Sequence, residues 1–300
     1  MRTASLTVAT VLVAALALTG CGSSSGSSGS SGPTASFDVS SVTKDDAIAA
    51  LLPAAIASRG TLVVGSDTTY APAEYVASDG KTPLGYDIDL IKDISAVLGL
   101  QVQVKTAAFD DIIPGIGSTF DVGISSFTIN ADRLDLVNMI SYYSAGEAYA
   151  VQKGNPRKVD PNNICGRTVA VQTGTTEEDE LAVTSAQCIS LGHDAITAIS
   201  HPAQSDVTAA LASGKADLMY ADSPIVAYAV QQSGGKLEML GDVFNTAPQG
   251  IVVSKNDAAL TQAVQKALQS LMDDGTYLAI LKAWGTDAGA ITKAELNPRP

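Results

Sequence analysis

The sequence predicts an α/β protein whose chain forms two lobes, each built on a parallel sheet. Two series of short apolar strands alternating with amphipathic helices, at residues 61–148 and 168–240, support this prediction, because such alternation is typical of parallel βαβ units. Polar or glycine-containing segments at 149–158 and 241–250 follow each series and are typical of crossings between domains. Two crossings make the first lobe discontinuous, with its parts at both ends of the chain.

The expected boundaries follow from these crossings. We expect lobe 1 to comprise residues 38–148 and 249–300, and lobe 2 to comprise residues 149–248. We expect the protein to be a monomer.

The N-terminal segment predicts export and lipid attachment. Within residues 1–20, Arg2 precedes an uncharged apolar run that ends in Leu-Thr-Gly before Cys21, the pattern of a signal peptide followed by a lipidation site. The run is too short for a transmembrane helix, and no second run of spanning length follows it. Residues 21–37 are therefore expected to be the lipidated cysteine and a flexible Gly/Ser linker. The alternative is an ordinary cleaved signal with an incidental cysteine, which would give a soluble product.

The elements of lobe 1 are predicted from apolar spacing and from breaking residues. Ile88, Ile91, Ile94 and Leu98 recur at helical spacing before Gly99, which ends the helix. In chain order we expect a connector helix at 42–58 interrupted at Pro53, strand 61–65, loop 66–72, helix 87–98, strand 101–105, a helical turn at 109–116, and, after the return, strand 251–254 and helices 260–272 and 276–284.

Lobe 2 is predicted in the same way. The acidic run Glu177–Glu180 suits the first turn of a helix, where the helix dipole favours negative charge. The expected elements are strand 168–171, helix 177–185, strand 195–199, helix 204–213, strand 217–221, helix 223–231 and strand 237–240.

Cys165 and Cys188 are the two remaining cysteines. In an exported chain an even pair favours a disulfide over a metal site. Two free buried thiols are the alternative.

Charge and motifs exclude several classes of function. The formal net charge of −13 argues against nucleic acid or an anionic membrane surface as a partner. His193 and His201 are isolated in the sequence, and we find neither a metal-ligand pattern nor a nucleotide-binding motif. No metal and no cofactor are therefore expected.

The stretch Asp121–Arg133 changes from a half-buried strand to hydroxyl residues and then to an arginine. Asn130 is a candidate N-cap, which places Arg133 in the first turn of a helix. A cation there opposes the helix dipole, whereas an anion held between the arginine and nearby N–H and hydroxyl donors would be stabilised. The stretch therefore predicts a carboxylate receptor. The alternative is a surface arginine paired with Asp132 or Asp135.

The order Ser-Ser-x-Thr-x-x-x-x-Arg in this stretch resembles the carboxylate-binding segment of the polar amino-acid solute-binding proteins of ABC importers, solute-binding protein family 3. The resemblance covers roughly residues 60–285 and implies the two-lobed type II periplasmic-binding-protein fold. Further motifs support it in order: Val64–Pro72, Gly85–Leu90, Phe109–Pro114, Gly174–Thr176, Ser213–Asp217 followed by Asp222, and Asp274–Tyr277.

The resemblance implies a role for each matching residue. Arg133 would bind the α-carboxylate in a bidentate manner, with Ser126, Thr128 and Thr176 adding hydrogen bonds. Asp222 would bind the ammonium group, unless it only caps the following helix. The side-chain slot would be lined by a further set of residues: Tyr70, Phe109 and Asp67. The two aromatic residues could instead be plain core, and Ala73 stands where the family usually has Phe.

The function implied is capture of a free amino acid for an ABC permease, outside the membrane and without catalysis. Asp67 beside two aromatic faces favours a basic side chain, with glutamine next and acidic amino acids disfavoured. A tethered sensor for a receptor kinase is an alternative, and so is a cyclohexadienyl-dehydratase-like enzyme with Glu177 as general acid.

Overall fold

A computed structural model describes residues 42–299 of the chain. The predicted signal peptide, Cys21 and the Gly/Ser linker lie outside the described residues. Within residues 42–299, no helix is both long enough and apolar enough to cross a bilayer.

One eight-stranded sheet organises the described chain, in the order β5-β1-β6-β11-β7-β10-β8-β9. On one side β1 (Thr61–Ser66) pairs in parallel with β5 (Gln101–Thr106) and β6 (Val122–Gly123). On the other side β8 (Thr168–Gln172) pairs in parallel with β9 (Thr197–His201) and β10 (Leu218–Asp222). We call the elements around the first group lobe 1 and those around the second group lobe 2. The predicted α/β class with two parallel groups of strands is confirmed.

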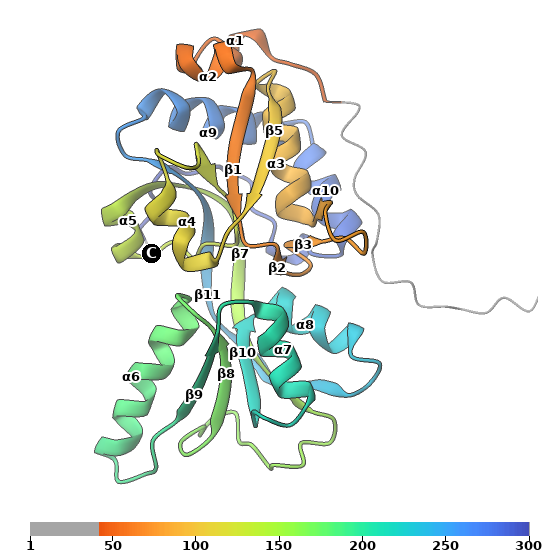
Figure 1. Cartoon of the computed structure of the whole chain (residues 1–300), viewed down its shortest axis with the longest axis vertical. Helices are drawn as coiled ribbons and strands as arrows, with labels where there is room; N and C mark the ends of the chain where they lie inside the picture. The colour runs from red at the N-terminus through yellow and green to blue at the C-terminus, as the bar shows by residue number, and fades with distance from the viewer. Residues whose placement is uncertain (1–41, 300) are drawn as a thin grey trace, which may run out of the picture. The chain divides into compact units, whose positions relative to one another are not determined.

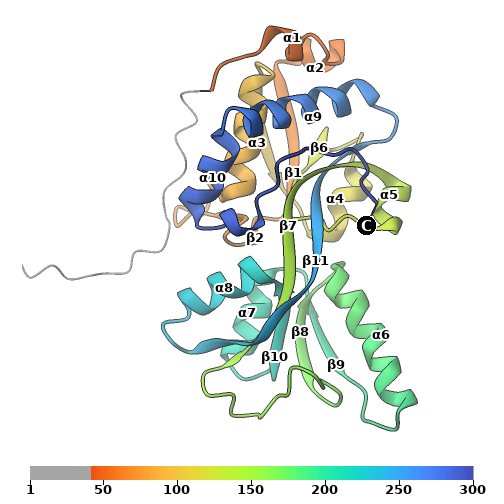
Figure 2. The ribbon, with the colours of Figure 1, turned by 180° about the vertical axis from the view of Figure 1, so that it is seen from behind.

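Two long antiparallel strands, β7 (Val137–Gln152) and β11 (Leu237–Ser254), carry the chain from one group to the other and back. Figures 1 and 2 show them side by side between the two groups. The sequence predicts the crossings at 149–158 and 241–250, and a strand at 237–240 separate from strand 251–254. Instead β11 is continuous. Its pairing with β7 shifts register between Leu240 and Phe244, between Phe244 and Ala247, and between Gln249 and Gly250, whereas Pro248 pairs in register with Ser144.

The helices and the small sheet of lobe 1 cover its strands. They are α1 (Asp46–Ala49), α2 (Ala54–Arg59), α3 (Tyr86–Val97), α4 (Phe109–Gly115), α5 (Ala131–Leu136), α9 (Ala258–Asp273), α10 (Thr276–Trp284) and the 3₁₀ turn η2 (Asp287–Gly289), with the small sheet β2 (Thr69–Tyr70), β3 (Glu74–Val76) and β4 (Pro83–Leu84). Pro53 interrupts the expected connector helix and precedes α2.

Lobe 2 carries α6 (Thr176–Ser190), α7 (Gln204–Ala212) and α8 (Ser223–Gln232). The predicted disulfide between Cys165 and Cys188 is confirmed, with the two Cα atoms 5.6 Å apart. It joins the segment before β8 to the last turn of α6 and extends the apolar cluster that contains Val169, Leu181 and Leu218.

Helix α3 shows how the apolar spacing becomes core. Its Ile88, Ile91 and Ile94 are fully buried, and the helix packs against β5, α9 and α10. Burying each such side chain stabilises the fold by roughly 1.5–3 kcal/mol. Trp284 of α10 is also buried and donates its indole N–H to Asp89 at 3.0 Å, so it is a packing residue.

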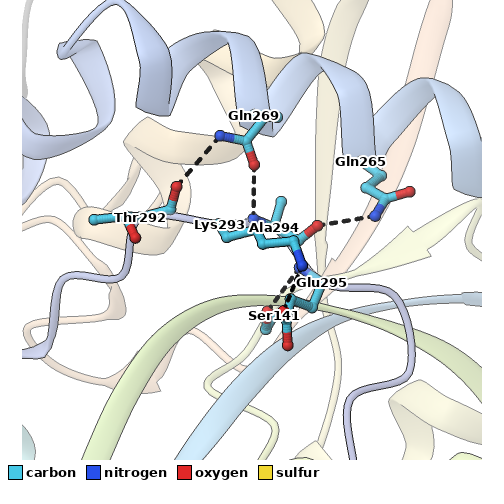
Figure 3. Close-up of polar contacts among 7 residues, drawn as sticks. All are labelled: Ser141, Gln265, Gln269, Thr292, Lys293, Ala294 and Glu295. Atoms are coloured by element: carbon cyan, nitrogen blue, oxygen red, sulfur yellow. Dashed lines mark hydrogen bonds and ion pairs between the residues drawn. The ribbon is translucent and has the colours of Figure 1, made fainter.

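The segment after η2 runs along lobe 1 and contacts the first part of β7 (Figure 3). Gln265 and Gln269 of α9 exchange hydrogen bonds with the backbone of Ala294 at 2.8 and 2.9 Å. Ser141 of β7 accepts the N–H of Glu295 at its side-chain oxygen and donates its own N–H to the Glu295 carbonyl. The tail therefore ties α9 to the strand that leads towards lobe 2.

Candidate functional site

One cavity brings together side chains from both lobes. Lobe 1 supplies six residues from β2, α4, α5 and the segment after β6, and lobe 2 supplies four from the start of α6 and the end of β10. They are Tyr70, Phe109, Ser125, Ser126, Thr128 and Arg133, then Thr175, Thr176, Glu177 and Asp222. The centre of a water-sized sphere can move in only about 10 Å³ of this cavity, room for about one water molecule. The cavity is therefore too small for an amino acid, and lobe 1 and lobe 2 must move apart before one can enter.

Arg133 is held at the cavity by its local fold. Asn130 caps α5 and accepts the N–H of Arg133 at 2.9 Å. The guanidinium donates to the carbonyl of Thr128 at 2.8 Å and, across to lobe 2, to the carbonyl of Gly174 at 3.3 Å. Its carbon lies 5.3 Å from the ring centre of Phe109. A guanidinium has five N–H donors, so these bonds orient it and leave donor capacity for an anion.

Arg133 is not a surface arginine. Its exposure is 9 %, and within the described part of the chain it forms no ion pair with Asp132, Asp135 or any other carboxylate. Burial lowers its pKa, while the charges of Glu177 and Asp222 act in the opposite direction. An anionic ligand would offset the free-energy cost of this desolvation, because it gives the guanidinium a counter-charge.

Gly174 permits the close approach of lobe 2 to lobe 1. Its φ is +78°, which favours glycine, and a Cβ there would lie 2.8 Å from the Cβ of Asp110. The glycine therefore allows its carbonyl to reach Arg133.

Asp222 ends β10 and precedes α8, but its side chain does not cap the helix. The carboxylate accepts hydrogen bonds from the Tyr70 hydroxyl and from the Gln249 amide, both at 2.9 Å. Burial, followed by the charge of Glu177, raises its pKa well above the usual value. The capping alternative is therefore wrong, and a cation placed beside Asp222 would favour its ionised form.

The hydroxyl residues form the wall between these two charges. The Oγ1 atoms of Thr128 and Thr176 lie 3.3 Å apart across the two lobes. Ser126 has a φ of +51°, a conformation rare outside glycine, and its N–H donates to Asp87 at 3.1 Å. Such backbone conformations concentrate at functional sites.

Asp67 does not line the cavity, in contrast to the slot position expected for it. One carboxylate oxygen accepts the Thr69 hydroxyl at 2.8 Å and the other accepts the Gln172 amide of β8. Its backbone N–H donates to Ser125 at 3.0 Å. Sequence reasoning did not assign a role to Gln172, whose amide turns Asp67 into a contact between the lobes.

Glu177 is the carboxyl on the cavity wall that the binding prediction missed. It was considered only as an acid for a dehydratase, yet it is 3 % exposed and lines the same cavity as Arg133 and Asp222. Its position directly after Thr176, in the first turn of a helix, was the available signal. Ser125 and Thr175 were also missed. Over residues 42–299 no cluster of His, Cys, Asp and Glu suitable for a metal ion is present.

Comparisons with known proteins place the chain among amino-acid-binding relatives. A model of the bacterial extracellular solute-binding proteins, family 3, matches residues 62–287. The arginine-binding protein ArgT of Corynebacterium glutamicum is 36% identical over 255 residues, which cover 84% of this chain and 83% of ArgT.

Two solved structures share the fold. An ancestral arginine-binding protein bound to arginine has a TM-score of 0.70 and 32% identity, covering 75% of this chain and 98% of its own. The ancestral amino acid-binding protein AncCDT-1, a precursor of cyclohexadienyl dehydratase, has a TM-score of 0.69 and 29% identity, covering 77% of this chain and 97% of its own.

Proposed function

Because this chain belongs to the bacterial extracellular solute-binding proteins, family 3, we propose that it captures a free basic amino acid, arginine foremost, for an ABC importer. The observation that carries the proposal is the placement of Arg133 from lobe 1 and Asp222 from lobe 2 on the wall of one buried cavity. A free α-amino acid carries one negative and one positive group, and these two residues match them. The name of ArgT and the arginine in the ancestral protein support arginine as the ligand.

Each group of the ligand has a proposed receptor. The α-carboxylate takes the free donors of Arg133, with Ser126, Thr128 and Thr176 around it, and the N-terminal end of α6 adds a favourable dipole. The ammonium group binds Asp222. Tyr70 and Phe109 form the aromatic wall of the side-chain slot.

Because the receptors lie on both lobes, bound ligand stabilises the closed arrangement relative to an open one. Opening would bend β7 and β11, the two strands that connect the lobes. We propose that the permease recognises the closed form. We further propose that Cys21 carries a lipid that holds a monomeric protein at the outer face of the cell membrane.

The relatives reported above are named as binding proteins, and AncCDT-1 is itself an amino acid-binding precursor of an enzyme. These names favour binding over catalysis for this chain.

A thermal-shift panel of amino acids tests the proposal. A ligand at about a thousand times its dissociation constant adds roughly 4 kcal/mol of stability, so the preferred amino acid should stand out clearly. We expect arginine to give the largest shift, followed by lysine or ornithine, then glutamine. A panel in which no free amino acid raises the midpoint would overturn the proposal.

A further inference from the structure

Glu177 is a buried acid on the cavity wall to which the proposed amino-acid contacts assign no partner. Its carboxylate accepts the Thr176 hydroxyl at 3.2 Å. Its exposure is 3 %, below that of Arg133 and Asp222. Its own backbone N–H is a second donor. A carboxylate with two local neutral donors and no ion pair in a site closed to water is weakly stabilised, because much of the hydration it loses is not replaced.

The charged and titratable groups around Glu177 come from several elements. Those that interact electrostatically with it are Arg133 of α5, Asp222 of β10, Glu147 of β7, Tyr70 of β2 and Glu180 of its own helix. Of these five groups, Arg133 is the one cation and the other four are acidic. On the cavity wall itself, Arg133 stands against Glu177 and Asp222.

This balance distinguishes between ligands. With both wall acids ionised, the three charged side chains sum to one negative charge. A zwitterionic amino acid with a neutral side chain leaves that charge uncompensated, so one acid must keep a proton. An amino acid with a cationic side chain neutralises it and lets both acids ionise.

We propose that Glu177, and not Asp67, is the residue that selects a cationic side chain in this cavity. Asp67 already has two protein donors, from Thr69 and Gln172, and does not reach the wall. The inference deepens the proposed capture of a basic amino acid and rests on it.

A proton linkage follows. Burial raises the pKa of Glu177, with Glu180 adding to the effect and Arg133 opposing it, and burial raises that of Asp222 as well. The free site therefore keeps a proton to higher pH than an exposed carboxyl would, and a cationic ligand displaces it into solvent. Affinity for a basic amino acid should rise with pH over the range in which the free site loses this proton, whereas affinity for a neutral isostere should change little.

Calorimetry on the full-length protein in detergent tests the inference with arginine and citrulline, which have the same length and differ in side-chain charge. For Glu177→Gln we expect arginine affinity to fall by about tenfold or more and citrulline affinity to stay within about threefold. Asp179→Asn is the matched control, since it removes an exposed acid from the same helical turn. Its charge acts on Arg133 from outside the cavity, so any effect should be small and equal for arginine and citrulline. Titrations of the unaltered protein in buffers of different ionisation enthalpy should show about one proton released with arginine and none with citrulline.

The outcomes separate the two proposals. If arginine binds the unaltered protein and Glu177→Gln weakens arginine and citrulline by the same factor, Glu177 does not select charge and the inference is wrong, while the proposed function stands. If the unaltered protein binds neither arginine nor any other amino acid, both are overturned. An unfolding midpoint of Glu177→Gln without ligand, equal to that of the unaltered protein, shows that the change in affinity is not a folding defect.

Discussion

Buried charged groups lie between the lobes in two places, at Asp67 and on the wall of the cavity, and they differ in whether a ligand can reach them. Asp67 receives hydrogen bonds from Thr69 and from Gln172 across the lobes. Arg133, Asp222 and Glu177 are similarly buried, but they line the cavity, where a ligand can place an opposite charge beside each of them. The Asp67 contact therefore stabilises closure with any ligand, whereas the cavity groups stabilise it most with a ligand that supplies the opposite charges.

The largest expected effect is at Arg133. Arg133→Ala should weaken arginine binding by about 2–5 kcal/mol, because it leaves the ligand carboxylate desolvated and unpaired. Arg133→Lys, which keeps the charge but loses the planar fork, should recover part of this loss. Calorimetry measures both variants, and a loss below about threefold for Arg133→Ala would contradict the assignment of Arg133 to the carboxylate.

The next effect is at Asp222. Asp222→Asn should weaken binding by about 1.5–3 kcal/mol, because the ammonium loses a charged acceptor while Tyr70 and Gln249 can still donate to the amide oxygen. Asp217→Asn is the control in lobe 2. Asp217 accepts the N–H of Thr168 and pairs with Arg157, so its loss should lower stability and leave affinity intact. Equal effects of the two variants on affinity would place the ammonium elsewhere.

Substitution of Asp67 should lower affinity less than the two changes above, and by the same factor for every ligand. Asp67→Asn weakens one hydrogen bond that favours closure, so affinity should fall by about 0.5–1.5 kcal/mol. Arginine and citrulline should lose the same factor, because Asp67 does not touch the cavity. A larger loss for arginine than for citrulline would return Asp67 to the side-chain slot and remove the contrast between the two contacts.

The sequence could predict the local arrangement around Arg133 because it lies within one short stretch. The N-cap at Asn130, the hydroxyl residues and Arg133 are close in the chain, so local rules place them together. The helices α9 and α10 were predicted for the same reason, since their apolar spacing is local.

Contacts between distant segments were not predictable in the same way. Gln172 lies over a hundred positions from Asp67, and the amide that satisfies this carboxylate follows from the packing of lobe 2 on lobe 1. Glu177 reaches the cavity through the same packing. The full length of the crossing strands was not predicted because glycine and proline usually mark loops. In β11 the pairing with β7 continues past them, with register shifts near Gly241 and Gly250 and with Pro248 in register.

A bond remote from both contacts should affect stability alone. Cys165 and Cys188 are separated by 23 positions, and closing a loop of that length stabilises the folded chain by roughly 3 kcal/mol through the entropy of the unfolded state. The paired change of both cysteines to alanine should therefore lower the free energy of unfolding by about that amount, measured by urea denaturation. Neither cysteine lines the cavity, so arginine affinity at a temperature where the variant is folded should be unchanged. A parallel loss of affinity would mean that the end of α6 transmits strain to Thr176 and Glu177 at its start, and that the cavity depends on the whole helix and not only on its first turn.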